Sequence, residues 1–185
     1  MIPHLRNPGA GRRAATGLIQ HSEPEAWRRI NEEPFEFRHL LVGHPLFSIE
    51  RLARLSERAF ERQDFGRYFK ATDLKLPRDV LKTRLRESIE RIAENGQWVS
   101  LHYIDEMDAE YGELFDLLLA DIEQIIHRPV RSEMTWGSMS VFLNAPGLKV
   151  PYHFDHETNF LMQLRGKKEA VSYTHLRAHE TREDL

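Results

Sequence analysis

The sequence predicts an α+β protein, with a helix-rich N-terminal half followed by β-structure. Apolar residues recur at helical spacing over about residues 80–92 and, most strongly, over residues 111–126. Beyond these helices, residues 134–143 and 158–164 are rich in β-formers. We therefore expect four parts: a flexible tail over residues 1–22, a helix-rich portion over 23–131, a β-portion over 132–170 and a separate C-terminal stretch over 171–185.

Turn-forming residues and the spacing of apolar residues predict a tail, followed by the first strands and the first helix. Residues 1–22 hold prolines, glycines and arginines without a clear apolar period, which indicates flexibility. Residues 35–41 alternate well enough for a strand. Ser48 is expected to cap a helix that runs to about Arg62, and residues 67–70 are expected to form a short strand.

In the middle of the chain, we expect two further helices with one strand between them in the sequence. The stripe over residues 80–92 predicts a helix that stops near Asn95-Gly96, because such residues commonly end helices. Residues 98–103 are expected to form a strand. The helix over residues 111–126 has to end before Pro129, because the residue before a proline disfavours the helical conformation.

Composition narrows the classes of function. The 26 Lys and Arg are nearly balanced by 29 Asp and Glu, for a net charge of −3, which argues against bulk nucleic-acid binding. The chain has no cysteine, so any metal would be held by His, Asp or Glu rather than by thiolates. No run approaches the roughly 18 apolar residues that span a bilayer, and no secretory signal is visible. We therefore expect a cytoplasmic protein that binds no membrane.

The segment from Tyr152 to Lys168 carries the chemistry. In a strand, residues two apart point to one face, so His153 and Asp155 can offer a ring nitrogen and a carboxylate oxygen to one metal ion. Two histidines and one carboxylate on one face of Fe(II) leave three positions for a bidentate cosubstrate and dioxygen. Lys167 or Lys168 can then pair with the far carboxylate of such a cosubstrate. The bare pair has a simpler interpretation, a histidine beside a solvated aspartate, because the chain has 10 histidines.

The wider pattern resembles a known family. The segment from Pro151 to Asp155, followed by Asn159-Phe160, Gln163 and the turn from Gly166 to Lys168, is similar to the JmjC/cupin-like Fe(II)- and 2-oxoglutarate-dependent oxygenases. It most resembles the cupin-like branch that includes the asparaginyl hydroxylase acting on hypoxia-inducible factor, over about residues 138–168. The resemblance implies that the β-portion forms the first strands of an incomplete double-stranded β-helix, of the cupin or jelly-roll type.

The resemblance assigns roles to individual residues. It implies that His153 and Asp155 are iron ligands and that Asn159 lines the pocket beside the metal. It implies that Lys168 pairs with the far carboxylate of 2-oxoglutarate, because the family pattern is Gly-x-Lys, although the choice between the two neighbouring lysines stays open. Gln163 shares strand parity with Asn159, so we expect both side chains to face the interior.

Two departures from the family pattern limit the match. Val150 stands where the asparaginyl hydroxylase has a threonine that helps to hold the cosubstrate. The second histidine ligand of the family lies well downstream, and no residue before Ala170 takes its place. His156 follows Asp155 directly and should point to the opposite face, so we expect a structural or substrate-side role for it.

Residues 171–185 resemble the one-frame translation of a transposase adapter used in sequencing libraries. We therefore expect the natural sequence to end or diverge near Ala170. For this reason His175 and His179 are excluded from the site, despite their i, i+4 spacing. With one iron ligand missing, the resemblance implies that this chain is an inactive, truncated fragment of an oxygenase.

Other classes of protein stay open as alternatives. One is a non-catalytic cupin-like module that binds a small molecule or a partner, and another is an interaction protein that works through an exposed apolar stripe on residues 111–126. The sequence does not decide whether the substrate is a protein side chain or a small molecule, nor whether the whole protein is a homodimer.

We expect the remaining charged residues and histidines to have structural roles. Arginines along residues 49–62 alternate with glutamates, which indicates a mixed solvated helix face rather than a nucleic-acid patch. Four scattered histidines are expected to be packed or exposed rather than metal ligands: His39, His44, His102 and His127.

Overall fold

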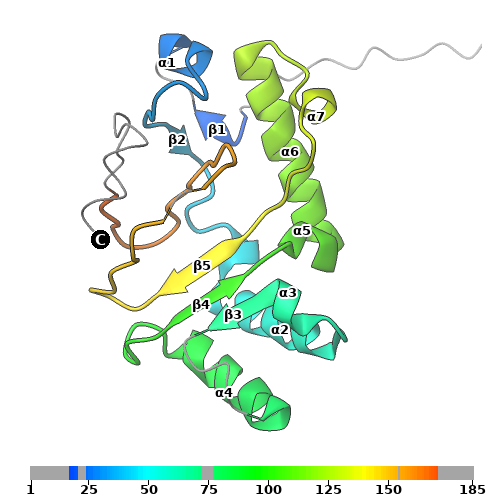
Figure 1. Cartoon of the computed structure of the whole chain (residues 1–185), viewed down its shortest axis with the longest axis vertical. Coiled ribbons are helices and arrows are strands. Elements are labelled where there is room, and N and C mark those ends of the chain that lie inside the picture. The colour runs from blue at the N-terminus through cyan, green and yellow to red at the C-terminus, as the bar shows by residue number, and fades with distance from the viewer. Residues whose placement is uncertain (1–16, 21–23, 72–76, 154, 171–185) are drawn as a thin grey trace, which may run out of the picture.

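The computed structural model describes residues 17–20, 24–71, 77–153 and 155–170. The expected α+β class is confirmed, since helices and two small antiparallel sheets share this part of the chain (Figure 1). The elements in order are β1 (Ile19–Gln20), α1 (Pro24–Arg28), β2 (Arg38–His39), the 3₁₀ turn η1 (Pro45–Phe47), α2 (Ile49–Glu61), α3 (Phe65–Tyr68), β3 (Phe69–Ala71), α4 (Arg78–Glu90), β4 (Trp98–Leu101), α5 (Ile104–Met107), α6 (Ala109–Ile126), α7 (Val130–Glu133) and β5 (Val141–Asn144).

The larger sheet has the strand order β3–β4–β5 and separates the core from solvent. Its register places Phe69, Leu101 and Val141 side by side on one face, and all three are buried. Phe142, one residue along β5, points to the other face and is 56% exposed. The period-two alternation of β5 therefore distinguishes the core side of the sheet from the solvent side.

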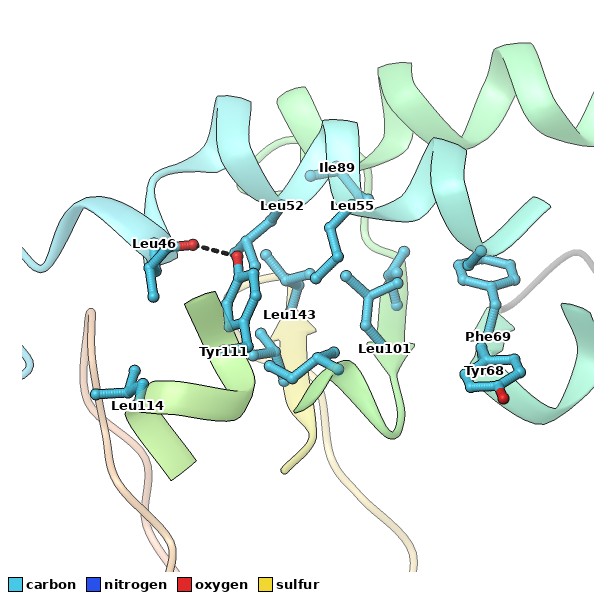
Figure 2. Packing of buried hydrophobic residues seen from close by; sticks show 14 of the residues in the cluster. Leu46, Leu52, Leu55, Tyr68, Phe69, Ile89, Leu101, Tyr111, Leu114 and Leu143 are labelled. Carbon is cyan, nitrogen blue, oxygen red and sulfur yellow. Dashed lines mark hydrogen bonds between the residues drawn. The ribbon is translucent and has the colours of Figure 1, made fainter. Parts of the chain in front are cut away.

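The core lies between the inner face of this sheet and the helices. Figure 2 shows Leu55 of α2 and Tyr111 of α6 converging on Leu101 and Leu143 of the sheet. Helix α4 packs along α2, and the short α5 leads directly into α6. The apolar stripe of α6 faces this core, with Tyr111, Leu118 and Ile122 buried, so it is not the large exposed surface that an interaction protein would need.

The predicted ends of the two best-defined helices are confirmed. The Ser48 side chain accepts a hydrogen bond from the Arg51 backbone N–H at 3.3 Å and so caps α2. Helix α6 ends before Pro129, with His127 in the left-handed conformation at its C-cap. At the other end of α6, the Asp108 side chain accepts from the Glu110 backbone N–H at 3.1 Å.

Three predicted boundaries are wrong. Helix α4 ends at Glu90, well before Asn95-Gly96, because the chain turns early and the Asn95 side-chain amide donates to the Ser88 carbonyl at 2.9 Å. The strand expected over residues 67–70 begins only at Phe69, after the short helix α3. The strand expected over residues 35–41 is reduced to Arg38–His39, because its partner β1 offers only two paired residues.

Most of the strand expected over residues 134–143 is also absent, since β5 begins only at Val141. The backbone before β5 bonds to α5 instead of to a strand. The Met139 N–H donates to Asp105 Oδ1 at 2.8 Å, and the Met139 carbonyl accepts from the Ile104 N–H at 3.0 Å. These contacts give the segment its backbone partners outside the sheet.

The last residues of the expected tail are structured. Ile19 is 4% exposed, pairs with His39, and donates its backbone N–H to Asp121 Oδ2 at 3.0 Å. A Cβ at Gly17 would lie 2.7 Å from Asp121 Oδ1, so a larger residue there would force this carboxylate to move. Residues 1–16 and 21–22 of the expected tail, and the whole stretch 171–185, lie outside the described residues.

Candidate metal site

A tight turn carries the chain from β5 to the predicted metal ligands. The Leu148 N–H donates to the Ala145 carbonyl at 3.3 Å around Pro146-Gly147, two residues that are common in turns. Gly147 has a φ of 76°, a conformation that glycine adopts without strain. From there the chain runs without regular structure to His153, past the edge of the sheet (Figure 1).

His153 and Asp155 lie close together on the surface. Their nearest polar atoms, Nε2 and Oδ2, are 3.7 Å apart, and the side chains are 61% and 53% exposed. His153 Nδ1 lies 2.9 Å from the carbonyl oxygen of Pro151. Because a carbonyl only accepts, this contact places a proton on Nδ1, so in the neutral ring Nε2 carries the lone pair that a metal ion would take.

Asn159 joins the same group. Its side-chain amide Nδ2 donates to Asp155 Oδ2 at 3.1 Å, so this oxygen contacts the asparagine on one side and approaches His153 on the other. Gln163 lies apart from the pair and donates its amide to the Arg165 carbonyl at 2.7 Å. Lys167 and Lys168 are both exposed, so exposure does not distinguish which of them would pair with a cosubstrate.

The strand expected over residues 158–164 does not form in the part of the chain that the structure describes. Its period-two pattern nevertheless appears in burial: Phe160, Met162 and Leu164 are half-buried, and the residues between them are exposed. The Phe160 ring stacks on Trp27 of α1, with 6.2 Å between the ring centroids. Asn159 and Gln163 consequently face solvent rather than the interior that we expected.

The separation of the pair is within reach of one divalent ion, but it exceeds the roughly 3.0 Å between neighbouring positions of an octahedral site, so binding would draw the two side chains closer. Two ligand atoms that each lie about 2.1 Å from a common ion can be at most about 4.2 Å apart, and 3.7 Å falls inside this limit. Within the described ranges, no group of three or more His, Cys, Asp or Glu side chains converges on one point. His156 is exposed beside the pair. The described residues thus bring together two candidate ligands, and a complete site would need at least one more.

Three of the four scattered histidines, His39, His44 and His102, make local contacts with hydrogen-bonding groups. His39 and His44 each accept a backbone N–H two residues along with Nδ1, at 3.2 and 3.4 Å. His102 is half-buried, with Ser100 Oγ 2.9 Å from Nε2 and Ser140 Oγ 3.3 Å from Nδ1. Burial lowers the pKa of His102 below its ordinary value, with a smaller contribution from the charge of Lys70.

The arginines of α2 form more than the expected solvated face. Arg54 pairs with Glu50 along the helix at 2.7 Å, as the spacing predicts. Arg51 and Arg58, however, both reach Asp108, the N-cap of α6, and the Arg51 contact is 2.9 Å long. The sequence reasoning missed this role of Asp108, although an aspartate directly before a strongly periodic helix is a recognised cap signal.

A separate hollow of about 380 Å³ lies between α4 and the start of the sheet. It includes none of the predicted site residues. Arg91, one of its cations, is already paired with Glu94 at 3.1 Å. Its lining residues are Ala71, Leu81, Arg84, Leu85, Glu87, Ser88, Arg91, Asn95 and Gln97.

Comparison of the chain with protein-family models, with curated proteins and with solved structures gives no match. Within the described ranges, no helix combines the length and apolar character needed to cross a membrane.

Proposed function

We propose that this chain is part of an Fe(II)- and 2-oxoglutarate-dependent oxygenase of the JmjC/cupin-like class, in which His153 and Asp155 hold the metal. The observation that carries the proposal is the 3.7 Å separation of His153 Nε2 from Asp155 Oδ2, inside a segment that resembles this class from Pro151 to Lys168. The exposure of both side chains also supports it, because the ion needs open positions for a cosubstrate and dioxygen.

Each residue of the site has its own task in this proposal. His153 donates the Nε2 lone pair, and Asp155 donates a carboxylate oxygen. Lys168, or its neighbour Lys167, supplies the positive charge that pairs with the far carboxylate of 2-oxoglutarate and so orients it. The bound iron and 2-oxoglutarate would supply the oxidative decarboxylation that is coupled to hydroxylation of a substrate C–H bond, on a protein side chain or a small molecule.

A double-stranded β-helix is the finer fold that belongs to this proposal. The alternation of half-buried Phe160 and Met162 with exposed Asn159 and Leu161 supports it, because a barrel strand has two faces of different polarity. The face that packs on Trp27 would be the outside of the barrel, and the exposed face would be its interior. The remaining histidine ligand would come from outside the described residues. We further propose that the enzyme is cytoplasmic.

The test is iron-dependent turnover by the natural protein. Purified protein with Fe(II), 2-oxoglutarate and dioxygen should produce succinate, and the His153→Ala variant should produce none above background. His127→Asn is the matched control, because asparagine tolerates the left-handed conformation of His127 and this residue is remote in sequence from the motif. Full activity in His153→Ala would reject the ligand assignment.

The 185-residue chain by itself should show little turnover, because its described residues supply two of the three expected ligands. Robust iron-dependent succinate production by this chain would contradict that expectation.

A non-catalytic cupin-like module is the second candidate, and the same shortage of ligands favours it. In such a module the segment would bind a small molecule without oxidising it. Two observations distinguish the candidates: whether the genomic sequence encodes a suitably placed histidine beyond Ala170, and whether 2-oxoglutarate binding in calorimetry is accompanied by turnover. Binding without succinate, in a protein that lacks this histidine, would favour the module.

A further inference from the structure

The carboxylate of Asp155 accepts a hydrogen bond from a neighbouring side chain. Asn159, four residues along the chain, donates its amide to Oδ2 at 3.1 Å, and the same oxygen lies 3.7 Å from His153 Nε2. Without a partner, the carboxylate of an exposed aspartate turns freely about its last bond. The amide restricts this rotation and fixes the direction in which the oxygen lone pairs point.

The ring of His153 makes a comparable contact with a backbone carbonyl. The Pro151 carbonyl, 2.9 Å from Nδ1, selects the ring tautomer in which Nε2 is unprotonated. Both candidate ligands therefore have a hydrogen-bond partner that restricts their orientation. Such outer partners are a general feature of metal sites, because a ligand that is already oriented loses less freedom on binding.

We propose that Asn159 is a positioning residue that acts on the metal ion through Asp155, and not a residue that contacts the cosubstrate. This inference rests on the proposed metal site. It differs from the role that the family resemblance implies, in which Asn159 lines the pocket beside the metal. Because Asn159 donates to the carboxylate of a candidate ligand, we expect its effect to appear in the binding of the ion alone.

Mn²⁺ alone is the probe that separates the two roles. The ¹⁵N-labelled 185-residue chain is titrated with Mn²⁺ in the absence of 2-oxoglutarate, and the Kd is obtained from paramagnetic broadening of backbone amide signals near residues 151–160. Asn159→Leu keeps a similar volume but removes the donor. We expect it to weaken Mn²⁺ binding about tenfold, the lower end of the usual effect of losing an outer partner.

Two further variants complete the comparison. Gln163→Leu removes the same chemical group from a side chain that is also exposed but donates to the Arg165 carbonyl, so its Kd should stay within about twofold of the parent value. Asn159→Gln keeps a donor on a longer arm and should recover part of the lost affinity. Because Asn159 is exposed, circular dichroism should show all these variants folded like the parent chain.

The outcomes are distinguishable. Unchanged Mn²⁺ binding in His153→Ala would reject the metal site itself, and with it the proposed function. Loss of binding in His153→Ala together with a parental Kd in Asn159→Leu would overturn only the role of Asn159. A parental Mn²⁺ affinity combined with weaker 2-oxoglutarate binding in the natural protein would assign Asn159 to the cosubstrate and would also overturn the inference.

Discussion

The hydroxyl of Tyr111 donates to the carbonyl oxygen of Leu46 at 2.5 Å, and this bond joins α6 to the turn in front of α2 (Figure 2). Tyr111 is fully buried. Its ring also packs edge-on against Phe47, with 6.0 Å between centroids. The link connects parts of the chain that are far apart in sequence, so it contributes to the packing of the two helices on one core.

Tyr111→Phe should destabilise the fold without changing it. The substitution keeps the ring but leaves the buried Leu46 carbonyl without its donor, at an expected cost of about 1–2 kcal/mol in the free energy of unfolding. Urea denaturation at pH 7, followed by circular dichroism, measures this difference. Tyr152→Phe is the control, because Tyr152 is 67% exposed and should change the stability little. A cost equal to that of the control would contradict the structural role of the bond.

The same tyrosine should make the protein sensitive to alkaline pH. Burial is the main cause that raises the pKa of Tyr111 to about 12, whereas in the unfolded chain it titrates near 10. The folded state therefore holds this proton more tightly, so its contribution to stability is complete below about pH 10 and is lost between about pH 10 and 12. The stability advantage of the parent chain over Tyr111→Phe should shrink across this window in denaturation series at increasing pH.

Asp108 should contribute to stability in two separable ways. It caps α6 through Oδ1 and pairs with Arg51 and Arg58 of α2 through Oδ2. Asp108→Asn keeps an oxygen for the cap but removes the charge, whereas Asp108→Ala removes both. We expect losses of about 1 kcal/mol for the asparagine variant and about 2–3 kcal/mol for the alanine variant. Equal losses in urea titrations would mean that the cap contributes nothing measurable.

Phe160 should anchor the segment that carries the metal ligands. Its ring stacks on Trp27 and meets Phe37 edge-on at 6.1 Å, so Phe160→Ala removes the contact between this segment and the N-terminal aromatic cluster. We expect a cost of about 1–3 kcal/mol and a change in Trp27 fluorescence. Leu161→Ala, at a neighbouring side chain that is 56% exposed, should change neither quantity appreciably.

His102 should titrate below the usual range of histidine, chiefly because it is partly buried. A folded state that disfavours the charged ring loses stability as the pH falls from about 6.5 toward the lowered pKa, because the unfolded chain takes up the proton first. Lys70→Gln should raise the pKa of His102 only in part, since burial remains. Ring signals in NMR titrations of both chains test this, and a normal pKa in the parent chain would contradict it.

The sequence predicted helices best where apolar spacing and a cap coincide. Ser48 and Pro129 mark their helix ends correctly, because their effects on the backbone are local. The strands were predicted less well. Only residues that find a partner become a strand, and the pairing of β4 with both β3 and β5 depends on contacts far apart in sequence.

At the candidate site too, the sequence indicated the chemistry of the side chains but not their contacts with the backbone. The sequence predicts that His153 and Asp155 share an ion, which stays a prediction, and their nearest polar atoms lie 3.7 Å apart. It gave no sign that the Pro151 carbonyl would meet the histidine ring, because a backbone carbonyl has the same chemistry at every residue. It also predicted an interior position for Asn159, which instead faces solvent, since no described strand pairs with this segment.

The segment over residues 159–164 has the side-chain order of a strand, but no backbone hydrogen bond is recorded for it among the described residues. If no other strand pairs with it, its amide protons should exchange with deuterated solvent almost as fast as those of an unstructured peptide, although Phe160 stays packed on Trp27. If a neighbouring strand pairs with one edge, every second amide should become protected, because successive N–H groups of a strand point to opposite edges. An alternating exchange pattern in a longer form of the protein would thus identify which edge of this segment is paired.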